Sequence, residues 1–114
     1  MNTSSPLSNL FFKKYHVYGA ELLTLYLKEN TFSLEQLDVK IKNFDFEGVR
    51  RWAHRIKGSS RAIYASQIEL IAEQIEEESL MGNQDFLRRK YNELEKNYKK
   101  LIKYVEIMNM ISGN

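Results

Sequence analysis

The residues with the clearest chemical potential lie together between Trp52 and Ser60 of this 114-residue chain. On a helix, at about 100° per residue, His54 points away from the apolar stripe. Lys57 and Gly58 share its side of the helix. Neutral imidazole is reactive near neutral pH, and a lysine one turn along can neutralise phosphoryl oxygens carried on a ring nitrogen. The stretch therefore predicts a phosphate-handling site on the protein surface.

The surroundings of His54 favour approach by another molecule. Gly58 falls in mid-helix, where glycine costs about 1 kcal/mol relative to alanine. No acidic residue occurs between Glu47 and Glu69. The basic residues that crowd this segment are Arg50, Arg51, Arg55, Lys57 and Arg61. A lone histidine on a helix usually has no chemical role, but a position opposite the apolar stripe makes a core histidine a poor explanation.

The sequence lacks the motifs of several common classes of functional site. There is no glycine-rich phosphate loop, no carboxylate pair at metal-ligand spacing and no serine–histidine–acid order. The absence of cysteine rules out disulfides and cysteine-ligated zinc. We therefore expect no metal site, no cofactor and no ATP site in this chain. It should accept and donate phosphoryl groups rather than act as a kinase.

Composition indicates one ordinary globular domain over residues 1–114. The chain is 43% hydrophobic and 28% charged, with a formal net charge of +2, so neither nucleic acid nor an acidic membrane is required as a partner. No apolar run approaches the roughly 18 residues of a membrane span, and the polar start does not resemble a signal peptide. We expect a cytoplasmic protein without membrane contact.

Helical periodicity runs through almost the whole chain, and no strand-like alternation is present. Residues 1–6 should form a disordered tail, with the bundle core over about 20–111. Ser33 and Gln36 resemble a capping box and predict a helix start there, and Asp45 should cap the helix that carries His54. The expected helices cover about residues 6–18, 22–30, 33–44, 46–64, 66–80 and 84–111. The predicted fold is an all-α antiparallel four-helix bundle with one or two short N-terminal helices.

The predicted core follows the apolar stripes of these helices. The first stripe contains Leu7, Leu10, Phe11, Tyr15 and Tyr18. The stripes of the next helices contain Leu34, Leu37, Ile41 and Phe44, and then Ile68, Ile71, Ala72 and Ile75. The last helix contributes Leu87, Tyr91, Leu94, Tyr98, Leu101, Val105 and Met108. Their 3.5-residue period favours an antiparallel bundle over a coiled coil between chains.

Residues 53–60, AHRIKGSS, resemble the A-H-x-L-K-G-S-S signature of histidine-containing phosphotransfer (HPt) domains. The resemblance implies a bundle that carries a phosphoryl group between the aspartates of two receiver domains. It implies that His54 is phosphorylated, that Lys57 stabilises the phosphoryl charge and that Gly58 lets the receiver approach. Glu76 matches a position where the family often has an acid or amide at the site. Alternatively, Glu76 is only a solvent-exposed member of an acidic run.

The same resemblance implies the partners. These would be receiver domains of a hybrid sensor histidine kinase, of a response regulator, or of both, and Mg²⁺ would belong to the receiver. We expect a monomer. The residues expected to dock the receiver are Arg50, Arg51, Arg55, Arg61 and Tyr64.

Tyr64 departs from the family pattern, which usually has glycine at this position. It either packs at the helix end or narrows which receiver can dock. One alternative function is an HPt-like adaptor that docks partners without being phosphorylated. Another is a helical domain that binds nucleic acid through the basic residues of the same segment, with steeply salt-dependent affinity.

Overall fold

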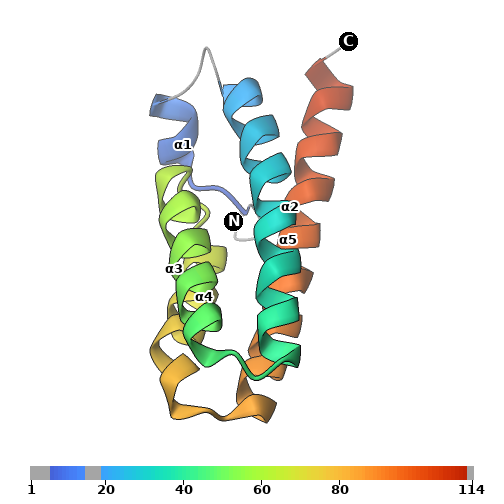
Figure 1. Cartoon of the computed structure of the whole chain (residues 1–114). Coiled ribbons are helices and arrows are strands. Elements are labelled where there is room, and N and C mark those ends of the chain that lie inside the picture. Colours follow the sequence, from blue (N-terminus) through green and yellow to red (C-terminus); the bar gives the residue numbers. More distant parts are fainter. Residues whose placement is uncertain (1–5, 15–18, 113–114) are drawn as a thin grey trace.

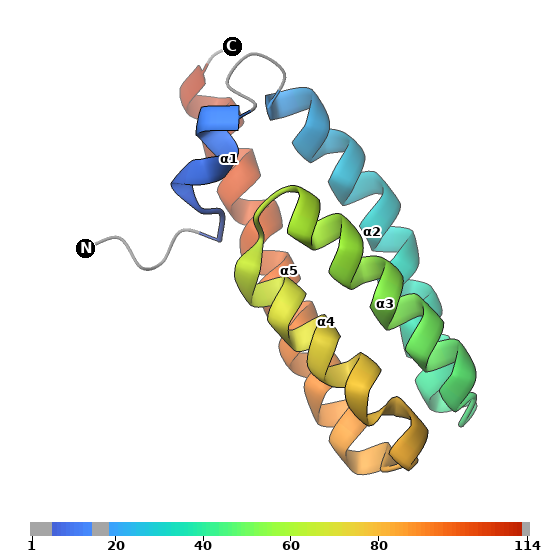
Figure 2. The ribbon, with the colours of Figure 1, turned by 90° about the vertical axis from the view of Figure 1, so that its left-hand side faces the viewer.

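The computed structural model describes residues 6–14 and 19–112, and every regular element within these ranges is helical. Its helices are α1 (Asn9–Lys14), α2 (Gly19–Lys42), α3 (Phe46–Ala62), α4 (Ser66–Glu78), the 3₁₀ turn η1 (Ser79–Met81) and α5 (Gln84–Ser112). The four long helices form an antiparallel bundle, and α1 lies near the end that holds the α3–α4 turn (Figure 1, Figure 2). The predicted all-α bundle with a short N-terminal helix is confirmed.

The helices pack around the bundle in chain order. α3 lies between α2 and α4, and α5 closes the bundle against α4 and α2, so that α3 and α5 are diagonal to each other. One apolar cluster fills the centre and includes Leu7 and Phe11 from the N-terminal segment. The stripe predicted for the last helix is confirmed from Leu87 to Val105, since all six of its positions over that span are buried.

The capping box predicted at Ser33 is wrong, because α2 runs without a break from residue 19 to residue 42. The polar side chains that suggested a helix boundary bond to backbone carbonyls one turn earlier. Asn30 Nδ2 donates to the carbonyl of Tyr26 at 3.0 Å, and Ser33 Oγ donates to that of Glu29 at 3.2 Å. Side chains satisfied in this way cap nothing, so two predicted helices merge into one.

Two predicted core residues are instead exposed. Leu10 is 55% exposed, and Phe44 is 62% exposed because α2 has already ended at Lys42. Phe44 has a left-handed backbone, with φ of 57°. Its N–H bonds to the carbonyl of Ile41 and the next N–H bonds to that of Lys40, which is the Schellman pattern of helix termination. Tyr15 and Tyr18 lie outside the described residues, as do residues 1–5 of the predicted tail.

Candidate phosphohistidine site

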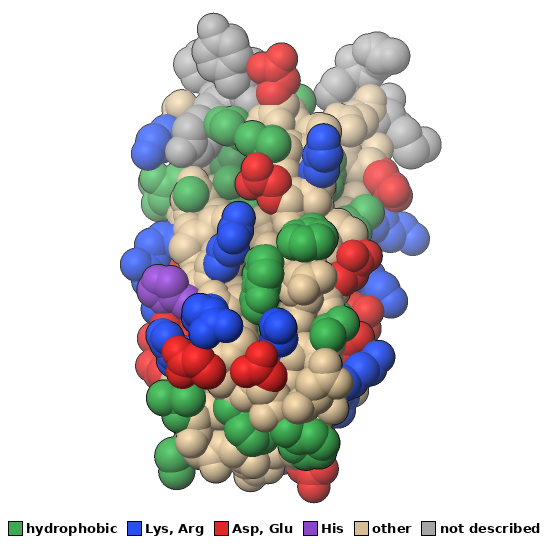
Figure 3. All heavy atoms as spheres, in the orientation of Figure 1, with side chains coloured by type: hydrophobic (Ala, Val, Ile, Leu, Met, Phe, Trp, Pro, Cys, Tyr) green, Lys and Arg blue, Asp and Glu red, His purple; other side chains and the backbone are tan. Residues whose placement is uncertain are grey.

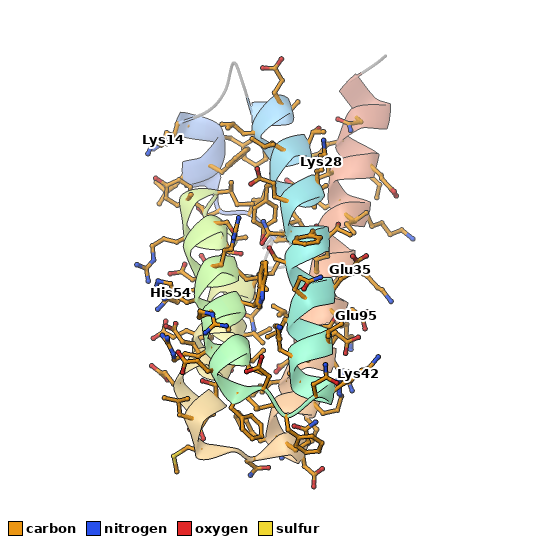
Figure 4. The ribbon with its side chains drawn as sticks, viewed as in Figure 1. Lys14, Lys28, Glu35, Lys42, His54 and Glu95 are labelled. Carbon is orange, nitrogen blue, oxygen red and sulfur yellow. The ribbon has the colours of Figure 1, made fainter. Side chains whose placement is uncertain are left out.

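His54 lies at the surface because the opposite side of α3 packs into the core. The helix begins as predicted, with Asp45 Oδ1 accepting the N–H of Gly48 at 3.0 Å. The residues it buries are Gly48, Val49, Ala53, Ile56 and Ser60. The side chain of His54 is 64% exposed, and it projects from the outer side of α3 (Figure 4).

Glu76 on α4 contacts both residues that the sequence singled out. Its Oε2 lies 2.8 Å from His54 Nδ1, and its Oε1 lies 2.8 Å from Lys57 Nζ. The glutamate side chain is only 18% exposed, and the lysine side chain 20%. The structure therefore places an exposed imidazole above a half-buried ion pair between α3 and α4.

The ionisation of Glu76 determines the tautomer of His54. Burial raises the pKa of the Glu76 carboxyl, but the contacts with Lys57 and His54 outweigh burial and lower that pKa below its ordinary value. An ionised carboxylate only accepts hydrogen bonds, so Nδ1 of the ring must carry the proton. In the neutral ring Nε2 then holds a free lone pair, which is the state that a nucleophile needs.

Nothing in the described part of the chain requires glycine at position 58. A Cβ added to it would meet nothing within 4 Å, and its backbone is helical. The residue is exposed one turn after His54 on the same side of α3. Glycine destabilises a helix here by about 0.5–1 kcal/mol relative to alanine. Close approach of another molecule to this side of α3 would explain why glycine is present.

The basic residues expected to dock a partner differ in their pairing. Arg50 pairs with Glu47, and Arg61 Nε lies 2.6 Å from Glu69 Oε2. Each interaction raises the pKa of the guanidinium concerned. The Arg55 guanidinium instead lies 5.3 Å from the centre of the Trp52 ring.

Tyr64 lies at the end of α3, ten residues beyond His54, and its side chain is half-buried against the core. Its φ of 61° is in the left-handed region, where a residue with a Cβ, such as tyrosine, destabilises the fold by roughly 1–2 kcal/mol. The N–H of Ala65 bonds to the carbonyl of Ser60, so α3 ends in a second Schellman motif. This conformation explains physically why glycine suits the position. Tyr64 packs against the core just after α3, and its effect on which receiver can dock stays a prediction.

Two hydrogen bonds that the sequence did not reveal join α3 to α2. The Tyr26 hydroxyl lies 2.6 Å from Ser60 Oγ, and both side chains are buried. Ser59 Oγ donates to Asn30 Oδ1 at 3.0 Å. The two serines of the AHRIKGSS motif therefore fix the position of α3 against its neighbour. No sequence signal pairs them with residues about 30 positions earlier.

The described part of the chain contains no group of three or more histidine, cysteine or acidic residues arranged to hold a metal ion. Within that same part, none of the helices is both long and apolar enough to cross a membrane.

One of the comparisons with known proteins found a match. The family model for the Hpt domain matches residues 21–104, which include His54, Lys57, Gly58 and Glu76. Neither the comparison with curated proteins nor the comparison with solved structures returned a match. The matched region covers most of the chain and includes all of α3 and α4. This protein belongs to the Hpt domain family, whose members are phosphoryl carriers in two-component signalling.

Proposed function

We propose that His54 is a phosphorelay intermediate, which accepts a phosphoryl group from the phosphoaspartate of one receiver domain and passes it to the aspartate of another. The observation that carries the proposal is the 2.8 Å contact between His54 Nδ1 and Glu76. In the neutral ring this contact holds the proton on Nδ1 and leaves the lone pair on Nε2, on a side chain that is 64% exposed. Such a ring can meet a partner's active site without any rearrangement of the bundle.

In this mechanism the Nε2 lone pair attacks phosphorus as the bond between phosphorus and the aspartyl oxygen breaks. The aspartate leaves as a carboxylate, and the ring carries a positive charge until the phosphoryl group moves on. Glu76 accepts the Nδ1 hydrogen throughout and stabilises that charge. Lys57 neutralises phosphoryl oxygens. The receiver supplies the Mg²⁺ that offsets the charge of the transferring group.

The rest of the proposal concerns the cellular setting. The chain acts as a monomer in the cytoplasm, and its partners are receiver domains of a hybrid sensor histidine kinase, of a response regulator, or of both. It carries the group without hydrolysing ATP. Gly58 leaves the space next to His54 open, so that the rim of the receiver's active site can come close.

The test is phosphoryl transfer from radiolabelled receiver domains in the presence of Mg²⁺. We expect a label on this chain that is stable to alkali, labile to acid and absent from His54→Gln. The chain has one other histidine, so His16→Gln is the matched control and should label like the wild type. If a folded sample accepts no label from a broad panel of receivers, the proposal fails and a docking adaptor becomes the better account.

A further inference from the structure

A pocket of about 200 Å³ opens between α2 and α5, on the side of the bundle away from His54. Leu34 of α2 and Ile102 of α5 line its apolar part, together with Tyr91 and Tyr98. Figure 3 shows acidic and basic side chains along the α2–α5 side, with the histidine at the opposite edge of the view. A ligand bound in this pocket would therefore leave the proposed transfer site open.

Two hydroxyl groups of the pocket wall can only accept a hydrogen bond from a ligand. Thr31 Oγ1 lies 2.7 Å from the Leu27 carbonyl and 2.9 Å from the Tyr98 hydroxyl, which itself lies 2.5 Å from that carbonyl. Each hydroxyl has one hydrogen, and this triangle of contacts uses both hydrogens. The two oxygens therefore have only lone pairs to offer an occupant.

Two carboxylates without an ion-pair partner lie at the same pocket, on neighbouring helices. Glu35 of α2 and Glu95 of α5 both line it (Figure 4), and neither is within ion-pair distance of a cation among the described residues. Lys99 also lines the pocket, but it is exposed and pairs with neither glutamate. Two carboxylates and one ammonium give the lining a net charge of −1.

The charges just outside the lining do not reverse this sign. Asp38 pairs with Arg88 at 2.8 Å and with Lys42 at 3.2 Å. Burial, followed by the charges of Asp38 and the two glutamates, raises the pKa of the Tyr91 phenol to about 12, and Arg88 only partly offsets these charges. The potential at the Tyr91 hydroxyl is therefore negative, which favours a cation.

The same hydroxyl is an unused polar group. Tyr91 is only 6% exposed, and within the part of the chain that the structure describes its hydroxyl has no hydrogen-bond partner. Buried polar groups usually have one. An occupant that donated a hydrogen bond to the Tyr91 oxygen would supply it.

Other kinds of ligand suit this wall less well. An anion would meet a negative potential, and a purely apolar molecule would leave the carboxylates and hydroxyls without partners. A divalent metal ion such as Ca²⁺ takes about six or more oxygen ligands, and the described ranges hold no group of three or more histidine, cysteine or acidic residues arranged to bind a metal. An organic cation, which only donates hydrogen bonds, fits best.

We propose that the pocket between α2 and α5 binds an alkylammonium group carried on a short apolar stem. The ammonium donates to Glu35, Glu95 and the Tyr91 hydroxyl, and the stem packs between Leu34 and Ile102. The volume is below the roughly 300–1,000 Å³ of sites for larger ligands, so the stem has only a few carbon atoms. A free amine and a lysine side chain of another protein share this chemistry. The site does not depend on the proposed phosphoryl transfer.

Amide NMR spectra of the whole isotope-labelled chain, titrated with n-butylammonium chloride, test the site. The largest shift changes should be saturable and should fall on residues 31–35 and 91–102. n-Butanol has a similar shape without the charge and should bind about tenfold more weakly. Equal affinity for the two probes, or shift changes that do not saturate, would overturn the inference.

Charge variants separate the pocket from the general surface. At low salt Glu95→Gln should weaken n-butylammonium binding about fivefold. Lys99→Met should strengthen it by a similar factor, because a competing positive charge is removed. Glu106→Gln is the matched control, since Glu106 is exposed further along α5, and it should change the affinity little. Equal effects of Glu95→Gln and Glu106→Gln would refute the pocket as the binding site.

Tyr91→Phe gives a readout that a purely structural role would not give. The hydroxyl has no partner in the described part of the chain, so its removal should leave the urea midpoint of unfolding unchanged and weaken n-butylammonium binding about fivefold. Lower stability with unchanged binding would contradict the proposed contact.

A glycine–lysine–glycine tripeptide with blocked ends distinguishes the two sources of the ammonium group. Tighter binding of the tripeptide than of n-butylammonium would assign the pocket to a lysine side chain of another protein, and the reverse order would assign it to a free amine. If neither probe shifts the pocket amides of a folded sample at millimolar concentrations, the inference is wrong.

Discussion

Replacing Glu76 would test how far the proposed phosphoryl acceptance by His54 depends on a fixed tautomer. Alanine removes the acceptor of the Nδ1 hydrogen, whereas glutamine keeps a carbonyl oxygen of similar reach without the charge. A hydrogen bond to a charged group is worth about 1.5–3 kcal/mol, and the lower end applies because the imidazole is 64% exposed. About 1.4 kcal/mol corresponds to a tenfold change in rate. Glu76→Ala should therefore slow phosphoryl acceptance about tenfold, and the rate of Glu76→Gln, which keeps the acceptor oxygen without the charge, should lie between that of Glu76→Ala and that of the wild type.

The assay is single-turnover transfer from a labelled receiver at saturating concentration, so that docking does not limit the rate. Glu77→Ala is the control, because Glu77 is exposed next to Glu76 and its loss changes the net charge equally. Circular dichroism confirms that each variant is folded. A Glu76→Ala rate within twofold of the wild type would refute orientation by this carboxylate. A Glu76→Gln rate as slow as that of Glu76→Ala would show that the charge, rather than the acceptor oxygen, is what matters.

Three further predictions concern stability, each measured as a free energy of unfolding in urea. Tyr26→Phe leaves the Ser60 hydroxyl buried without its 2.6 Å partner, so it should cost about 1–3 kcal/mol; adding Ser60→Ala should recover part of that loss, and a strictly additive double variant would refute the pairing. Phe44→Asn should raise stability by about 0.5–1 kcal/mol, because asparagine tolerates the left-handed backbone better; a lower stability would contradict this account of strain. The pKa of Glu76 is lowered on folding, so its contribution is complete above its ordinary value of 4.5 and is lost as the pH falls through the folded value. The wild type should thus lose more stability than Glu76→Gln between pH 5 and about pH 3, and equal losses would show that this carboxyl is not responsible.

The resemblance to HPt domains has a physical basis that is visible in the fold. The small, polar and charged positions of the motif all lie on one helix, and each faces a different neighbour. Ser60 faces Tyr26 on α2, Lys57 faces Glu76 on α4, and Gly58 faces open space. A short sequence motif can be specific because each of its residues is constrained by a different neighbour, such as α2, α4 or the solvent.

Features that depend on neighbours along the chain could be predicted from the sequence. The spacing of apolar residues on α3 placed His54, Lys57 and Gly58 together opposite the core, because helix geometry alone determines which residues share a side. The cap at Asp45 followed from local chemistry as well. Local signals failed at Ser33, where a polar residue that suits a helix start can equally bond backward inside a continuous helix.

Features that join separate helices were decided by the tertiary structure. Glu76 belongs to an acidic run, and nothing local distinguishes it from its neighbours; packing of α4 on α3 brings this carboxylate to within 2.8 Å of both His54 and Lys57. The same holds for the surface charges, because intramolecular partners neutralise Arg61 and leave Arg55 available. Helix periodicity thus predicted which histidine is exposed beside Lys57 and Gly58, whereas its contact with Glu76 and the pairing of the surface arginines depend on residues far apart in the chain.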